Sequence, residues 1–255
     1  MGIILCEIFL YGLIFFAGAC IYSFLNVVIY RVPKKESFVS GRSYCPVCGH
    51  SLGMLDMMPV FSFLFLGGKC RYCKSRIGVR DTLVEILGGL TLLFCMYKYE
   101  RTEMALTVFA FYGILTVVTF LDIDTMEIAD GCHLAMVLLA LISWFTMTGP
   151  GLVERLVGAF CVSVPMLVLT MLIPGAFGGG DIKLMAACGL FLGWKCTLVS
   201  TFLGFLFGGV WAVGLLLTGK AERKEHFAFG PFLCLGMGIG LIYGQTLINW
   251  YIGLF

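Results

Sequence analysis

The chain alternates long apolar runs with short polar connections along almost its whole length of 255 residues. A helix needs about 20 apolar residues to cross the hydrocarbon core of a bilayer. Runs of roughly this kind occupy eight positions, at 3–30, 83–99, 104–121, 131–148, 152–173, 182–194, 197–218 and 231–250. The sixth is short, so we expect it to tilt or to begin in a cavity lined by protein. This pattern predicts an all-α polytopic membrane protein with about eight transmembrane helices.

The composition agrees with a helical membrane protein. Hydrophobic residues make up 60% of the chain and charged residues only 13%, whereas charged residues are about 25% of a typical soluble domain. The 33 glycines are expected where helices pack closely in lipid. A soluble globular protein is therefore excluded, and the lipid bilayer is the expected surrounding. The net charge of +2 gives no indication of nucleic-acid binding, and none is expected.

Lysine and arginine are unevenly distributed between the polar connections. If the end of the first apolar run faces the cytoplasm, the cytoplasmic connections hold thirteen of these residues and the other connections hold four. Three of the thirteen are Lys220, Arg223 and Lys224. An excess of positive charge marks the cytoplasmic side of short loops. The distribution predicts a multi-pass protein of the cytoplasmic membrane with both termini outside.

Four cysteines in the first polar connection form two C-x-x-C pairs, separated by twenty-one residues: Cys45, Cys48, Cys70 and Cys73. Two thiolate pairs at this spacing suit one tetrahedral zinc ion. Free thiols also indicate a reducing compartment, in agreement with the distribution of positive charge. We therefore predict a small zinc-ribbon-like cytoplasmic domain at 31–82, inserted between a first transmembrane helix at 1–30 and a transmembrane bundle at 83–255.

Two aspartates stand at the ends of apolar runs. Asp122 directly follows one run, and Asp181 directly precedes another, after three glycines. The predicted topology places both on the cytoplasmic side. Two aspartates that share one proton can hydrolyse a peptide, because one activates water while the other donates a proton to the carbonyl oxygen. Aspartates also cap helix ends, and the residues alone leave both interpretations open.

Other polar residues lie in or beside the apolar runs. Lys183 is either an anchor on the cytoplasmic side or a cation that stabilises ionised Asp181 or a substrate carboxylate. Glu85 lies just inside the second run, where a charge needs a partner; Arg80 or the cation of a bound ligand would serve. Asn26, within the first run, is interpreted as an interhelical hydrogen-bonding residue.

The sequence GGGDIKL at Gly178–Leu184 resembles the G-x-G-D motif of intramembrane aspartyl proteases, in the G-x-G-D-x-K-L form of bacterial type IV prepilin peptidases. Further landmarks are similar to that family in the same order: Ser23–Pro33, the cysteine-containing insert with Asp56–Ser62 and Gly68–Cys70, Arg80–Glu85, and Phe229–Phe232. The resemblance covers nearly the whole chain. It implies catalytic roles for Asp122 and Asp181, with Gly178, Gly180 and Lys183 in support.

The connection that contains Asp122 leaves one alternative open. In the family, the first catalytic aspartate stands several residues before an Ile/Leu-Pro-Asp sequence, which here reads Ile128-Ala129-Asp130. Alanine replaces the proline, so Asp124 remains an alternative, although we prefer Asp122 because it abuts the apolar run. Asp124, Glu127 and Asp130 are otherwise interpreted as a solvated acidic turn, and His133 as a lone histidine without chemistry.

The resemblance also implies an activity. It implies that the leader of type IV prepilin or pseudopilin precursors is cleaved at the cytoplasmic face of the bacterial inner membrane. It further implies N-methylation of the new N-terminus with S-adenosylmethionine, with Gly68 and Lys69 as candidates for holding this cofactor. The alternatives are a peptidase with a purely structural zinc, a non-catalytic pilus assembly protein and an ion-coupled transporter. The precursor and the oligomeric state stay open.

Overall fold

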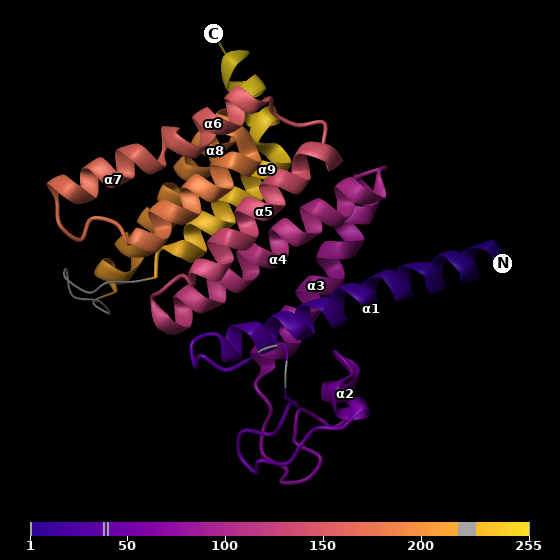
Figure 1. Ribbon diagram of the computed structural model, residues 1–255. Helices are drawn as coiled ribbons and strands as arrows, with labels where there is room; N and C mark the ends of the chain where they lie inside the picture. The colour runs from indigo at the N-terminus through magenta and orange to yellow at the C-terminus, as the bar shows by residue number, and fades with distance from the viewer. Residues whose placement is uncertain (1, 38, 40, 219–227, 255) are drawn as a thin grey trace. The chain divides into compact units, whose positions relative to one another are not determined.

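The computed structural model describes residues 2–37, 39, 41–218 and 228–254 (Figure 1). Within these ranges the chain is helical and has two isolated β-bridges but no strand, as the apolar runs predict. It divides into two compact units, a first unit at Met1–Phe109 and a second unit at Ala110–Phe255. The predicted cytoplasmic residues Lys220, Arg223 and Lys224 lie outside the described residues.

The first unit is built on two packed helices, α1 (Gly2–Arg31) and α3 (Val79–Lys98), with η1 (Met54–Met57) and α2 (Phe61–Phe65) between them in sequence. Glycines allow the close approach, because a Cβ on Gly88 would lie 2.3 Å from the ring of Tyr22. The amide of Asn26 donates to the backbone oxygen of Asp81 at 3.0 Å. This bond confirms the prediction that Asn26 links two helices.

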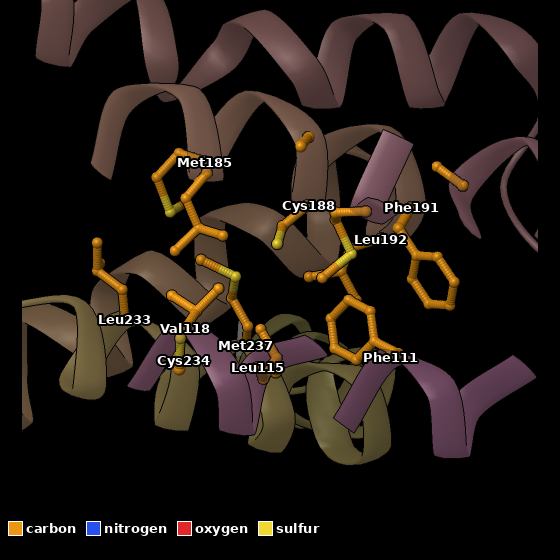
Figure 2. Packing of buried hydrophobic residues seen from close by; sticks show 14 of the residues in the cluster. Phe111, Leu115, Val118, Met185, Cys188, Phe191, Leu192, Leu233, Cys234 and Met237 are labelled. Carbon is orange, nitrogen blue, oxygen red and sulfur yellow. The ribbon is translucent and has the colours of Figure 1, made fainter. Parts of the chain in front are cut away.

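The second unit contains the end of α4 and five further helices. Their bounds are α4 (Thr102–Thr125), α5 (Asp130–Thr146), α6 (Leu152–Cys161), α7 (Ser163–Leu172), α8 (Gly179–Leu217) and α9 (Gly230–Ile252). Figure 2 shows the core that they enclose, formed by Phe111, Leu115 and Val118 of α4, Met185, Cys188, Phe191 and Leu192 of α8, and Leu233, Cys234 and Met237 of α9. Glycine again sets the spacing, since a Cβ on Gly236 of α9 would lie 2.2 Å from the backbone oxygen of Ser200 in α8.

The predicted segment at 152–173 forms two helices, α6 and α7, which meet at Val162. Pro165 explains the break. Proline lacks a backbone N–H, and its ring clashes with the carbonyl four residues earlier, which here belongs to Cys161. Helix α6 ends at that residue.

Helix α8 is two helical legs, 179–192 and 194–217, joined at Gly193, whose φ is 73°. The first leg begins where Gly180 packs on Ile128, just after α4. The second leg runs antiparallel to α9, because Gly208 packs on Phe229 while Gly244 packs on Cys196. Both legs therefore have an end beside the C-terminal end of α4. The chain reverses at Gly193, which agrees with the separate runs predicted at 182–194 and 197–218.

Five helices of the described residues are long and apolar enough to cross a membrane: Ile4–Arg31, Thr102–Thr125, Leu152–Leu172, Gly179–Leu217 and Gly230–Ile252. The predicted number of about eight is not confirmed. Charged residues lower the apolar character of α3, which contains Arg80, Asp81, Glu85 and Lys98. Helix α5 has only 17 residues, and the two legs of α8 count once. The chain is a helical membrane protein.

Candidate active site

Asp122 lies in the last turn of α4 and is 6% exposed. Its Oδ2 accepts a hydrogen bond of 2.9 Å from the backbone N–H of Gly230, the first residue of α9. The N-terminus of a helix carries partial positive charge and unpaired N–H groups, so it favours an anion. Helix α9 therefore holds the carboxylate that α4 presents.

Asp181 lies in the first turn of α8. The backbone N–H of Gly178, the residue that precedes this helix, donates to its carboxylate. The two carboxylates are close enough for the negative charge of Asp122 to act on Asp181. The structure thus brings together the two aspartates that the sequence singles out. Asp122 comes from the end of α4 and is held by the N-terminus of α9, and Asp181 lies at the N-terminus of α8.

The alternative residue Asp124 is exposed. It follows Asp122 by two positions, and two residues of a helix are separated by about 200° around the axis. When Asp122 faces the bundle, Asp124 must face away from it. Helix geometry therefore favours Asp122 as the partner of Asp181, a choice that the spacing in the sequence left open.

The three glycines before Asp181 are not equivalent. A Cβ on Gly178 would lie 3.2 Å from the carboxylate of Asp181, and a Cβ on Gly180 would lie 3.2 Å from Cβ of Ile128. Nothing lies within 4 Å of a Cβ placed on Gly179. Close approach therefore requires glycine at the first and third positions, and the middle position is open.

A polar network that the sequence did not predict ties the start of α5 to the start of α8. His133 is buried, and its Nε2–H donates to the backbone oxygen of Gly180 at 3.0 Å. Its Nδ1 lies 3.6 Å from Oδ1 of Asp130, which also accepts a 2.7 Å bond from Lys183 Nζ. Lys183 is thus paired with Asp130. The sequence signal that would have pointed to His133 is its place three residues after Asp130 on one helical face.

The four cysteines of the first unit converge as predicted. Their sulfur atoms all lie within 4.8 Å of one another, and those of Cys45 and Cys73 are 3.8 Å apart. A tetrahedron with Zn–S bonds of about 2.3 Å has edges of about 3.8 Å. The donor set and its spacing therefore fit one zinc ion.

The two C-x-x-C pairs lie in two separate turns of the same kind. An antiparallel bridge between Tyr44 and Ser51 closes the first turn, and one between Lys69 and Arg76 closes the second. Backbone N–H groups point at the sulfurs of these turns. Those of Cys48 and Val47 lower the pKa of the Cys45 thiol to about 6. Such turns favour the thiolate form that a metal requires.

A cavity of about 650 Å³ lies in the first unit and is lined by residues of α1, α3 and the cysteine turns. Cys45 and Cys70 contribute to its wall, as do Ser23 and Glu85. Gly68 and Lys69, the sequence candidates for cofactor binding, are not among its lining residues. Gly68 has a φ of 69°, and a Cβ there would lie 3.0 Å from the ring of Phe63, which does line the cavity.

Comparison with known proteins gives a consistent result over both units. Residues 16–99 match the bacterial peptidase A24 N-terminal domain, and residues 109–213 match the type IV leader peptidase family. Similar relatives are proteins described as prepilin leader peptidase/N-methyltransferase. The one from Aeromonas salmonicida is 28% identical over 95% of this chain and 94% of its own length. The one from Bacillus subtilis is 27% identical over 94% of this chain and 97% of its own length. The one from Pseudomonas aeruginosa is 28% identical over 99% of this chain and 94% of its own length. No solved structure matches the chain.

Proposed function

Because the chain belongs to the type IV leader peptidase family, we propose that it cleaves the leader from type IV prepilin or pseudopilin precursors and methylates the new N-terminus. The observation that carries the peptidase function is the meeting of Asp122 and Asp181 at one end of the helix bundle. The match to proteins described as prepilin leader peptidase/N-methyltransferase over most of the chain supports the double activity.

In the cleavage reaction, the two carboxylates share one proton. The ionised aspartate removes a proton from water, which attacks the scissile carbonyl carbon, while the protonated aspartate donates to the carbonyl oxygen. The proton is then returned to the leaving amine as the C–N bond breaks. Glycine at positions 178 and 180 lets the chain before Asp181 pack closely against its neighbours. Lys183 joins the start of α5 to the start of α8 through its bond to Asp130.

The position of the two aspartates suits a substrate that is itself a membrane helix. A precursor helix anchored in the same bilayer meets the enzyme by diffusion in two dimensions. Its scissile bond lies at the cytoplasmic end of its apolar segment, where α4 ends and α8 begins. We therefore assign the aspartates to the cytoplasmic face and both termini to the outside, in keeping with the distribution of lysine and arginine.

We assign methyl transfer to the N-terminal part of the chain, with 1–30 as the first transmembrane helix, 31–82 as the zinc-binding domain and 83–255 as the peptidase bundle. Zinc would be held by Cys45, Cys48, Cys70 and Cys73, whose spacing fits the ion, and would supply folding energy. S-adenosylmethionine supplies the methyl group. Gly68 and Lys69 are candidates for supporting its binding, because Gly68 packs against Phe63 of the cavity wall.

The peptidase proposal is tested with purified protein and a prepilin-like precursor. Asp122→Asn and Asp181→Asn should each abolish cleavage without loss of expression, because neither carboxylate alone supplies both the base and the acid. Asp124→Asn is the matched control and should keep most activity. An active Asp122→Asn variant beside an inactive Asp124→Asn variant would show that the wrong aspartate has been assigned. Labelled S-adenosylmethionine in the same reaction tests methyl transfer. Cleavage without transfer of the label would show that the protein is a peptidase without methyltransferase activity.

A further inference from the structure

The segment between the two cysteine turns exposes many apolar side chains, although it belongs to a part of the chain that the sequence assigns to the cytoplasm. Seven large hydrophobic side chains are exposed here, by 37% to 88%: Met54, Leu55, Met57, Met58, Phe61, Leu64 and Phe65. Clustered apolar side chains on a surface mark a contact with a partner or with a membrane. Neither the pair of aspartates nor the cysteine cluster gives these side chains a task.

Helix α2 turns one apolar face outward. Phe61, Leu64 and Phe65 stand at positions i, i+3 and i+4, which share one side of a helix, and all three are exposed. Ser62 and Phe63 stand on the opposite side and line the cavity of the first unit. Because the inner face lies against the rest of the unit, the outward face is left for a different contact.

Two ring contacts join this outward face to α1, beside which α2 lies (Figure 1). The rings of Phe61 and Phe65 stack with their centroids 6.4 Å apart, and the ring of Phe61 lies 6.1 Å from that of Phe16. Phe16 is at the middle of α1, about 20 Å from either end at 1.5 Å per residue. The hydrocarbon core is about 30 Å thick, so a transmembrane α1 carries Phe16, and Phe61 with it, into that core.

A polar contact attaches the start of α2 to α1 at a similar level. The backbone N–H of Val60 donates to Oε2 of Glu85 at 2.8 Å, and Oε1 of Glu85 accepts a 2.7 Å bond from the hydroxyl of Ser23. Ser23 stands eight residues before Arg31, the end of α1, which is about 12 Å along the helix axis. The segment is therefore held beside the apolar span of α1 and not at its end.

The backbone of this segment meets the first condition that lipid imposes, which is that its polar groups find partners within the protein. The N–H groups of Ser62, Leu64 and Leu66 each donate to the backbone oxygen four residues earlier. The N–H of Gly68, in the turn that follows, donates to the backbone oxygen of Phe63. The short helix and its closing turn thus form a hydrogen-bonded unit that hydrocarbon can surround.

The charges meet the second condition, which is that a charge at membrane depth is paired. Asp56 is the one charged residue in the sequence 54–68, and its Oδ1 lies 2.7 Å from Nε of Arg71. Arg31 and Arg76 line the cavity, together with the inner face of α2. The outward face of α2 itself carries apolar side chains alone.

We propose that residues 54–66 form a re-entrant segment that inserts into the bilayer leaflet in which α1 ends, with Phe61, Leu64 and Phe65 against lipid acyl chains. The continuity of this face with the middle of α1 selects lipid as the occupant. The cysteine turns flank the segment on both sides in the sequence, so its insertion holds them against the membrane surface. This lipid contact goes beyond the proposed peptidase and methyltransferase activities and depends on neither.

The test asks whether lipid or water reaches Phe65. The full chain, with zinc bound and with trifluoromethylphenylalanine in place of Phe65, is reconstituted in nanodiscs of phosphatidylethanolamine and phosphatidylglycerol. Fluorine NMR intensities are measured with phospholipid that carries a nitroxide on its acyl chain, and separately with a water-soluble gadolinium chelate. We expect the signal at position 65 to be lost with the nitroxide lipid and retained with the chelate.

Two further positions of the first unit calibrate the probes. The same label at Phe9, which is exposed on α1, should respond as a side chain in lipid, and at Tyr72, which is exposed in the second cysteine turn, as a side chain in water. Zinc content and melting temperature equal to those of the unlabelled chain show that each labelled protein is folded. If the label at Phe65 fails this check, the label is placed at Phe61 and the same responses are expected.

Three results at position 65 would overturn the proposal. A signal lost with the chelate alone would place the segment in water. A signal lost with both probes would place it among the headgroups, above the acyl chains. A signal retained with both probes would show that protein, such as a second copy of the chain, covers the outward face of α2.

Discussion

Gly230 is expected to contribute strongly to cleavage although it has no side chain to take part in chemistry. It is the first residue of α9, and its N–H binds Oδ2 of Asp122 at 2.9 Å. A Cβ added at this position would lie 2.7 Å from the same oxygen and 3.1 Å from Cγ of Asp122. Gly230→Ala therefore pushes the carboxylate away from the group that holds it.

The size of the effect follows from these contacts. Ordinary van der Waals contact needs at least 3.4 Å, so the carboxylate of Asp122 must shift by several tenths of an ångström, and its bond to Gly230 is weakened. A hydrogen bond to a charged group contributes about 1.5–3 kcal/mol. Each 1.4 kcal/mol of barrier is about a factor of ten in rate. We expect kcat to fall by about tenfold to a hundredfold, with KM nearly unchanged because substrate contacts elsewhere are retained.

The assay is cleavage of a prepilin-like precursor in detergent micelles, with initial rates measured over a range of substrate concentrations. Gly131→Ala is the matched control, because it lies near the start of α5 and a Cβ there would have nothing within 4 Å. Overpacking costs about 1–3 kcal/mol of stability, so melting temperatures must show that Gly230→Ala is folded at the assay temperature. A folded Gly230→Ala enzyme with kcat within twofold of the unaltered chain would refute the reasoning that α9 positions Asp122.

Three further outcomes are expected. Gly180→Ala should lower cleavage by about tenfold and Gly179→Ala should leave it near normal, since only the former meets a neighbour; equal rates in the same assay would contradict this. His133→Ala should lower kcat by about fivefold to tenfold through loss of one hydrogen bond of about 1 kcal/mol. His133→Asn should restore part of this loss if its amide reaches the backbone oxygen of Gly180. A kcat unaffected by His133→Ala would count against the view that His133 positions the chain before Asp181. The double variant Cys45→Ser and Cys70→Ser should bind no zinc by metal analysis, with structural zinc worth about 10–16 kcal/mol of apparent folding energy in small domains; stoichiometric zinc in this variant would disprove the site.

The apolar runs were sufficient to locate the helices, because a bilayer leaves the backbone few other ways to satisfy its hydrogen bonds. The choice between Asp122 and Asp124 and the break at Pro165 are two details that the apolar runs alone do not decide. Helix phase places Asp122 inward and Asp124 outward, and the ring of proline divides 152–173 into two helices. The number of spans depends on similar local details, such as the reversal at Gly193.

The supporting contacts of the site were less accessible to prediction. Gly230 binds Asp122 from 108 positions away, and no period or spacing in the sequence encodes such a tertiary contact. His133 and Asp130 were interpreted as residues without chemistry, since a lone histidine and an acidic turn are common in solvated loops. The cysteine pairs were the opposite case. Their spacing is fixed by the coordination of one metal ion, so a local pattern was sufficient to bring Cys45 and Cys73 together.

The bond between Gly230 and Asp122 also has a consequence for how the protease is made. Ribosomes deliver the chain from its N-terminus, so α4 and the first leg of α8 enter the membrane before α9 is synthesised. Asp122 is without the N–H of Gly230 until α9 has inserted. A nascent chain would therefore carry both aspartates in an unfinished arrangement and stay inactive toward other membrane helices beside it. Catalytic competence therefore waits for the insertion of α9 and is timed by the order of the helices in the sequence.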